Sequence, residues 1–201
     1  MYKVLITGGI GVGKTTVCKL FEQLGVPVFY SDLQAKKITN SNQRVISEIK
    51  KHFGDHMYIN NSLDRKTLGD IVFKDKNKLA ILNSIVVDVV HERFDEWVDA
   101  NEVFKDSEYV INEAAIAIEC NYQDKFDLTI VVTADEDIRI KRVMSRDACT
   151  EDSVRSRINS QLTEEEKIKH ADIIIQNNDS LELEEQVKVV HEKILNNIKN
   201  I

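Results

Sequence analysis

The chain has little proline, little cysteine and no long apolar stretch. Its only proline is Pro27, and its three cysteines, Cys18, Cys120 and Cys149, form no C-x-x-C pair. An odd number of widely spaced cysteines excludes a disulfide framework or a zinc motif and fits a reducing compartment. The apolar runs, such as 128–132, are far below the roughly 18 residues of a membrane span, and the N-terminal residues lack a signal-peptide pattern. We therefore expect a cytoplasmic protein without membrane contact.

Positive charge is also scarce. The 27 Lys and Arg residues face 34 Asp and Glu residues, so the formal net charge is -7. Affinity for a nucleic-acid backbone comes from clustered Lys and Arg, so we expect no nucleic-acid partner. An anionic ligand must instead be bound by a few local cations. With 42% hydrophobic and 30% charged residues over 201 positions, the composition excludes disorder and suits one globular domain.

Short apolar runs alternate along the chain with segments of helical periodicity. The runs predict strands at 2–7, 27–31, 108–112, 128–133 and 172–176. Helices are expected at 14–24, 135–146, 151–161, 163–170 and 180–201. Strand alternating with helix predicts an α/β fold of three layers, with a parallel sheet between helices.

A long block between the second and third strands breaks this alternation. Residues 33–106 are polar-rich with apolar residues at helical spacing, and Leu82, Val86, Val90, Phe94 and Trp97 follow one face of a long helix. We expect this block to be a mostly helical insertion. The five histidines show no metal-ligand spacing and are expected at the surface or at helix ends.

The residues from Gly8 to Thr15 read GGIGVGKT and fit the pattern G-x-x-x-x-G-K-[ST] between a strand and a helix. Such glycines let backbone N–H groups turn toward phosphate oxygens, at the positive end of the helix dipole. Lys14 would offset charge on the β- and γ-phosphates, and the Thr15 hydroxyl would bind Mg²⁺. The sequence therefore predicts a P-loop that binds ATP with Mg²⁺. Its expected contacts are Gly11, Val12, Gly13, Lys14, Thr15 and Thr16.

Arginines gather late in the chain. Five of the eight lie within 139–157, and the chain has neither an N-K-x-D guanine reader nor a strand that ends in an Asp-Glu pair. Small P-loop kinases close a basic lid over ATP, since positioned cations and exclusion of water favour phosphoryl transfer. We predict a kinase with a lid at 147–165. Arg142 and Arg146, spaced i,i+4, are the candidate phosphate cations, whereas Arg139 and Arg155 are expected to be surface or partner charges.

Two carboxylates follow predicted strands, where open α/β sheets bind ligands. Asp32 could accept the proton of a hydroxyl acceptor, or it could cap a helix that begins at Leu33. Glu113 could hold Mg²⁺ through water, or it could pair with Lys14. The expected domain is a single P-loop kinase domain. In it 1–32 and 107–201 form the nucleotide-binding core, and the 33–106 insertion binds the acceptor.

These residues resemble the dephospho-CoA kinase family over nearly the whole chain. The resemblance rests on TGGIGVGKTT at 7–16, Ser31-Asp32 before Ala35-Lys36, FGD at 53–55, LDRKTLGDIVF at 63–73, RVMSRD at 142–147, RINSQ at 157–161 and ADIIIQN at 171–177. It implies ATP-dependent phosphorylation of the ribose 3′-hydroxyl of dephospho-CoA, the last step of coenzyme A synthesis. It also implies that Asp32 is the base, Arg65 an acceptor-side contact, Arg142 and Arg146 the lid cations, and Asn177 a residue near adenine.

The chain departs from the family pattern at three places. Tyr30-Ser31-Asp32 stands where members often have Asp-x-Asp, Val87-Asp88 stands where they often have His-Pro, and EAAIAIE at 113–119 replaces D-x-P-L-L-F-E. The alternatives are another small-molecule or nucleoside monophosphate kinase, and a nucleotide-gated binding protein without transfer chemistry.

Overall fold

A computed structural model describes residues 1–100, 107–178 and 180–200. The described residues form two compact units. The first holds residues 1–30 together with the described residues after 106, and the second holds Ser31–Ala100. The end of the expected insertion at 101–106 and the last residue of the expected C-terminal helix, Ile201, lie outside the described residues.

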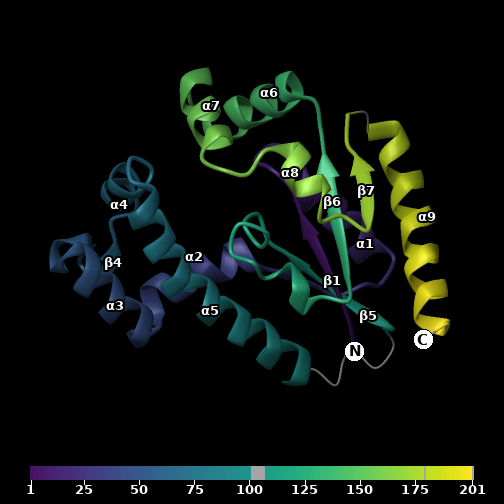
Figure 1. Cartoon of the computed structure of the whole chain (residues 1–201), viewed down its shortest axis with the longest axis horizontal. Helices are drawn as coiled ribbons and strands as arrows, with labels where there is room; N and C mark the ends of the chain where they lie inside the picture. The colour runs from purple at the N-terminus through teal and green to yellow at the C-terminus, as the bar shows by residue number, and fades with distance from the viewer. Residues whose placement is uncertain (101–106, 179, 201) are drawn as a thin grey trace. The chain divides into compact units, whose positions relative to one another are not determined.

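The first unit is built on a five-stranded sheet in which every pairing is parallel (Figure 1). The strand order is β2-β5-β1-β6-β7. The strands are β1 (Tyr2–Thr7), β2 (Val28–Tyr30), β5 (Tyr109–Glu113), β6 (Leu128–Thr133) and β7 (Ile173–Gln176). Every residue of β5 and β6 is buried, because strands inside a parallel sheet are covered on both faces. The predicted strands and the α/β fold are confirmed.

The carboxyl ends of the strands meet at one edge of the sheet. Ile6 of β1 is opposite Glu113 of β5, and Thr7 of β1 is opposite Val131 of β6. The segment that follows Thr7 therefore leaves the sheet beside the end of β5. This register decides which side chains can reach the glycine-rich loop.

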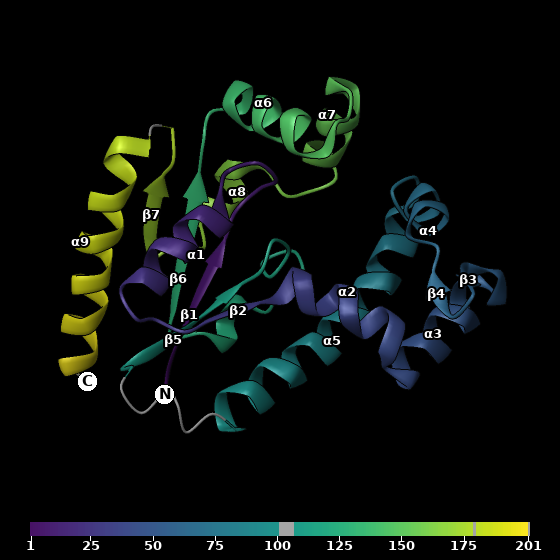
Figure 2. The ribbon, with the colours of Figure 1, turned by 180° about the vertical axis from the view of Figure 1, so that it is seen from behind.

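Two amphipathic helices cover one face of the sheet. They are α1 (Lys14–Gln23) and α9 (Ser180–Lys199), and Figure 2 shows both beside the strands. Phe21 of α1 and Ile194 of α9 are fully buried in the same core cluster as Ile130 of β6. Burying one such side chain stabilises the fold by about 1.5–3 kcal/mol. Cys18 is buried in this core too, as predicted, and burial raises the pKa of its thiol.

Three shorter helices follow β6: α6 (Glu136–Asp147), α7 (Glu151–Asn159) and α8 (Glu164–Ile168). Ala148 ends α6 in the left-handed region at φ 48°, and the Thr150 hydroxyl caps α7. The predicted helices at 135–146 and 151–161 are therefore two separate helices, as expected. A short 3-10 helix, η3 (Gln123–Lys125), precedes β6.

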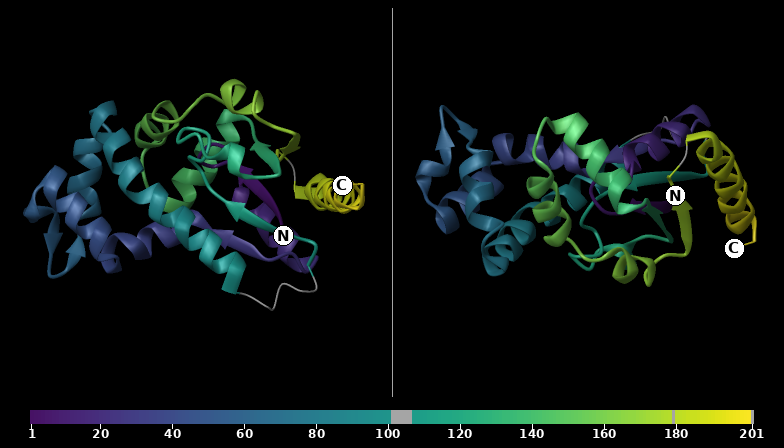
Figure 3. Two further views of the ribbon diagram at one scale, coloured as in Figure 1. Left: turned by 60° about the horizontal axis from the view of Figure 1, so that its bottom comes forward. Right: turned by 90° about the horizontal axis from the view of Figure 1, so that it is seen from above.

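The second unit is mostly helical, as predicted. Its helices are α2 (Ser31–Ser41), α3 (Gln43–Phe53), η1 (Asp55–Met57), α4 (Arg65–Val72) and α5 (Lys76–Ala100). Figure 3 shows α5 running beside α2. Val86, Val90 and Phe94 of α5 are buried, which confirms the predicted apolar face. None of the described helices is long and apolar enough to cross a membrane.

Two features of this unit differ from expectation. A small antiparallel hairpin, β3 (Tyr58–Ile59) and β4 (Ser62–Leu63), turns at Asn60 and Asn61, both with positive φ. An Asn-Asn pair suits a two-residue hairpin turn. His91 is 8% exposed and stacks near Phe94, so its expected surface position is wrong. It lies on the apolar face of α5, one residue after the buried Val90.

Candidate active site

The glycine-rich loop joins β1 to α1 and packs tightly against Arg139 and Asn177. Gly11 and Gly13 have φ of +82° and +87°, which disfavour any side chain. A Cβ on Gly13 would lie 2.1 Å from Asn177 Nδ2, and one on Gly11 would lie 2.7 Å from the carbonyl oxygen of Arg139. The loop thus presents backbone amides at the start of a helix, which is an arrangement that binds phosphate.

Lys14 lies within the loop. It is only 8% exposed, and its Nζ donates to the carbonyl oxygens of Gly8 at 3.1 Å and Gly9 at 3.4 Å. Glu113 Oε1 is 4.0 Å from the same ammonium group, and Glu113 is itself buried. The predicted pairing of Glu113 with Lys14 is therefore confirmed, and its alternative role beside Mg²⁺ stays a prediction.

Thr15 and Thr16 occupy the first turn of α1 and are exposed. Val12, by contrast, is fully buried. The two threonines are thus available to a ligand, and Val12 contributes to the loop through its backbone.

Asn177 follows β7 directly and is 3% exposed. Its side-chain Nδ2 donates to the carbonyl oxygen of Val12 at 2.8 Å, and its backbone N–H donates to that of Thr133 at 2.8 Å. The structure therefore brings Asn177 against the phosphate-binding loop. Its proposed contact with adenine stays a prediction.

The two candidate lid arginines have different partners. Arg142 of α6 is half-buried, and its Nη1 donates to the carbonyl oxygen of Asn177 at 2.9 Å. Arg146 is exposed, and its Nε donates to Asp147 Oδ1 at 2.7 Å. Arg157 of α7 contacts the other oxygen of Asp147 at 2.8 Å. Hydrogen bonds from Arg146, and then from Arg157, lower the pKa of Asp147 to about 2.

The expectation for Arg155 is confirmed and that for Arg139 is wrong. Arg155 is exposed and pairs with Glu136 and Glu151. Arg139 is 8% exposed, and its Nε donates to the carbonyl oxygen of Ile10, inside the loop, at 3.0 Å. Arg139 therefore lies on the face of α6 turned toward the loop, together with the buried Ile140 and Val143. Sequence periodicity alone did not tell this face from the solvent face.

Asp32 is exposed in the first turn of α2. Because α2 already begins at Ser31, Asp32 is inside the helix, and its expected role as an N-cap before Leu33 is wrong. Its charge still interacts favourably with the helix dipole.

Arg65 begins α4 and holds α2 from the side. Its Nη2 donates to the carbonyl oxygen of Lys36 at 2.6 Å and to Thr39 Oγ1 at 2.8 Å. It therefore fixes the helix that carries Asp32, a role that the sequence did not suggest.

Sequence reasoning missed two further groups around the loop. Gln161, within the RINSQ segment, accepts a hydrogen bond from the backbone N–H of Ile10 at 2.8 Å. Lys167 of α8 is 1% exposed and pairs with Glu119, and burial lowers its pKa. A lysine that follows three glutamates carries no signal of burial, so only the structure reveals it.

A buried lysine inside a glycine loop, at the carboxyl edge of a parallel sheet and next to an arginine helix, is the arrangement of a P-loop kinase. The family model for dephospho-CoA kinase matches residues 2–182. The chain belongs to the dephospho-CoA kinase family.

Individual relatives agree over the full length. The chain is 34% identical over 197 residues to a dephospho-CoA kinase of Listeria monocytogenes, with 96% of each chain covered. It is 36% identical over 196 residues to that of Thermobifida fusca, again with 96% of each covered. A solved dephospho-CoA kinase from Campylobacter jejuni superimposes with a TM-score of 0.66 at 26% identity, covering 96% of both chains.

Proposed function

We propose that the protein transfers the γ-phosphate of ATP to the ribose 3′-hydroxyl of dephospho-CoA and so makes coenzyme A and ADP, the last step of coenzyme A biosynthesis. The observation that carries the proposal is the Lys14 loop, in a chain that belongs to this family over residues 2–182. The proposed substrates are ATP and dephospho-CoA, and the proposed location is the cytoplasm. A net charge of -7 speaks against a nucleic-acid substrate.

The loop binds the phosphates of ATP. The amides of Gly11, Val12 and Gly13 and those of the first turn of α1 face the phosphates, and Lys14 offsets their charge. The Lys14 ammonium contacts two loop carbonyls and Glu113, which hold it at the loop. From this position it would reach the phosphate oxygens of ATP.

The donors next to the loop suit Mg²⁺. Thr15 offers an exposed hydroxyl, and Glu113 is a buried carboxylate at the end of β5, so both present the oxygen ligands that this ion prefers. Thr15 would hold the ion directly and Glu113 through water. The bound ion would neutralise charge on the transferred phosphoryl group.

Asp32 serves the acceptor. A ribose hydroxyl is a poor nucleophile at neutral pH, so a carboxylate that orients it and takes its proton speeds transfer by roughly 100- to 10,000-fold. Asp32 is exposed, as an acceptor contact requires. Arg65 positions α2 and contacts the acceptor on this side.

The lid supplies cations and excludes water. Residues 147–165 form the lid, and Arg142 and Arg146 stabilise the charge that spreads over the transferred group. Arg142 is held beside the loop by Asn177. Asn177 in turn would lie near the adenine of ATP.

A panel of acceptors tests the proposal. ADP formation from ATP is measured with dephospho-CoA, AMP, CMP and adenosine as acceptors. We expect ADP formation with dephospho-CoA and with none of the other three acceptors. Turnover with a nucleoside monophosphate would reassign the acceptor, and ATP binding without ADP formation in any mixture would indicate a nucleotide-gated binding protein.

A further inference from the structure

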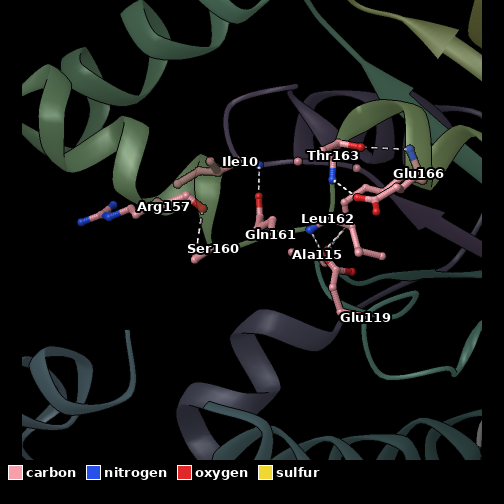
Figure 4. A network of polar contacts seen from close by, with 12 residues as sticks. Ile10, Ala115, Glu119, Arg157, Ser160, Gln161, Leu162, Thr163 and Glu166 are labelled. Carbon is pink, nitrogen blue, oxygen red and sulfur yellow. Dashed lines mark hydrogen bonds and ion pairs between the residues drawn. The ribbon is translucent and has the colours of Figure 1, made fainter. Parts of the chain in front are cut away.

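The peptide groups of Ile10, at the tip of the loop, are held at both polar atoms by side chains from distant elements. The N–H of Ile10 donates to Gln161 Oε1 at 2.8 Å, as Figure 4 shows. Its carbonyl oxygen accepts a hydrogen bond from Arg139 Nε at 3.0 Å. Ile10 is separated from these residues by more than 120 positions in sequence, so neither contact is a local turn.

Arg139 touches the loop on both sides of Ile10 as well. A Cβ on Gly9 would lie 2.5 Å from Arg139 Nη2, and one on Gly11 would lie 3.0 Å from Arg139 Cα. Three consecutive loop residues therefore pack against this single arginine. Arg139 is only 8% exposed, so its guanidinium gives up hydration, and the contact with the loop carbonyl compensates for part of that loss.

Gln161 is itself held in a well-fixed segment (Figure 4). The next residue, Leu162, donates its N–H to Glu119 Oε1 at 3.3 Å. Glu119 also pairs with the buried Lys167, whose Nζ donates to the carbonyl oxygen of Ala115 at 3.2 Å. Thr163 and Glu166 form a reciprocal capping box at the start of α8. The Gln161 side chain thus projects from an anchored segment to the loop.

We propose that Arg139 and Gln161 are positioning residues that set the loop in the conformation that receives the phosphates of ATP. Loop amides can stabilise phosphates only if they already point at them, because reorientation during binding would cost free energy. Holding the N–H and the carbonyl oxygen of Ile10 fixes the orientation of the two successive peptide groups at the loop tip. Gln161 follows α7 and lies inside the proposed lid, so this hydrogen bond also links the lid to the loop.

The inference rests on the proposed binding of ATP at this loop, so the first measurement is calorimetric binding of ATP to the wild-type chain without any acceptor. Failure of the wild type to bind ATP would count against the proposed function itself. The variants are Gln161→Met and Arg139→Met, which keep side-chain length and remove the bonds to Ile10. Lys188→Met, at an exposed position of α9 outside the loop and the lid, is the matched control.

We expect each variant to raise the Kd and the KM for ATP by about 3- to 10-fold, as the net value of one hydrogen bond implies. The KM for dephospho-CoA should stay within about twofold, and Lys188→Met should match the wild type in every measurement. The double variant should lose less than the product of the two single losses, because both side chains bond to the backbone of one residue, Ile10.

A purely structural role predicts a different pattern. It would lower the melting temperature and leave the ATP Kd of the folded protein unchanged, and that result would overturn the proposal. If Gln161→Met does not fold, Gln161→Asn replaces it. The Asn side chain is shorter by one methylene group, so its oxygen cannot reach the N–H of Ile10, which lies 2.8 Å from Gln161 Oε1. The ATP Kd and the melting temperature of Gln161→Asn then distinguish a positioning role from a purely structural one.

Discussion

Arg142 Nη1 donates to the carbonyl oxygen of Asn177 at 2.9 Å, and this bond ties α6 to the end of β7. Asn177 in turn holds the carbonyl oxygen of Val12 in the loop at 2.8 Å. One of the two lid arginines is therefore held beside the loop by contacts within the protein. Arg146 is not, because its guanidinium is engaged with Asp147.

We expect Arg142→Ala and Arg146→Ala each to lower kcat more than they raise the KM for ATP, because a cation that meets the transferred phosphoryl group acts mainly on the transition state. Steady-state kinetics with dephospho-CoA as acceptor measure both values. Lys188→Ala, at an exposed position of α9, is the control and should retain wild-type kinetics. A variant that changes only the KM for ATP would mark its arginine as a ground-state phosphate contact.

Lys14→Met should reduce phosphoryl transfer by roughly 100-fold or more, as loss of a preorganised electrostatic partner does. The melting temperature should fall as well, because Glu113 and two loop carbonyls lose the buried ammonium group. Lys19→Met, at an exposed position of the same helix, is the matched control. Unchanged kcat in Lys14→Met would contradict the assignment of the loop.

Asp32→Asn tests the acceptor chemistry. The amide keeps the size of the side chain but cannot take a proton, so kcat with dephospho-CoA should fall by roughly 100-fold or more. Loss of charge in the first helical turn costs only about 0.3–1 kcal/mol of stability. The melting temperature should therefore drop by no more than about 4 °C.

The control for this substitution is Asp70→Asn, at an exposed position of α4 in the same unit. It should leave kcat and the KM for dephospho-CoA unchanged. Near-normal turnover by Asp32→Asn would remove Asp32 from the mechanism and leave positioning by Arg65 and the lid as the account of transfer.

The pair of Tyr109 and His191 should make stability depend on pH. The Tyr109 hydroxyl lies 2.7 Å from His191 Nδ1, and burial lowers the pKa of His191. In the unfolded chain the His191 imidazole takes up a proton near pH 6.5, and in the folded chain it does so only at a lower pH. The free energy of unfolding therefore falls as the pH drops below about 6.5. Melting temperatures between pH 7.5 and 5.5 measure the slope, which should be shallower in His191→Gln. An equal slope in both proteins would exclude His191 as its source.

The sheet and the loop could be predicted because their signals are local. Apolar runs such as 128–133 mark buried strands, and the G-K-T pattern marks both a turn and a helix start. The same holds for the buried stripe of α5, where Val86, Val90 and Phe94 repeat at helical spacing.

The contacts that complete the site could not be predicted in this way, because each joins residues far apart in sequence. Arg139 and Arg155 have the same side chain and lie in neighbouring helices, yet one packs against the loop and the other faces solvent. The difference depends on which face of its helix each occupies, and polar helices carry little periodic signal to reveal it. Gln161 belongs to the family resemblance, but its partner is a backbone amide, which no side-chain pattern discloses.

The order of the strands has a consequence for how the chain folds during its synthesis on the ribosome. β1 pairs only with β5 and β6, so its partners begin more than 100 residues later. The glycine loop therefore cannot reach its final conformation while the N-terminal half is being synthesised. Pairing β1 with β5 and β6 must also close a chain segment of this length, which slows formation of the sheet. Residues 31–100 contain their own short-range helix contacts and can order first. We expect nascent chains stalled before β6 to contain a folded helical unit but no ATP-binding loop.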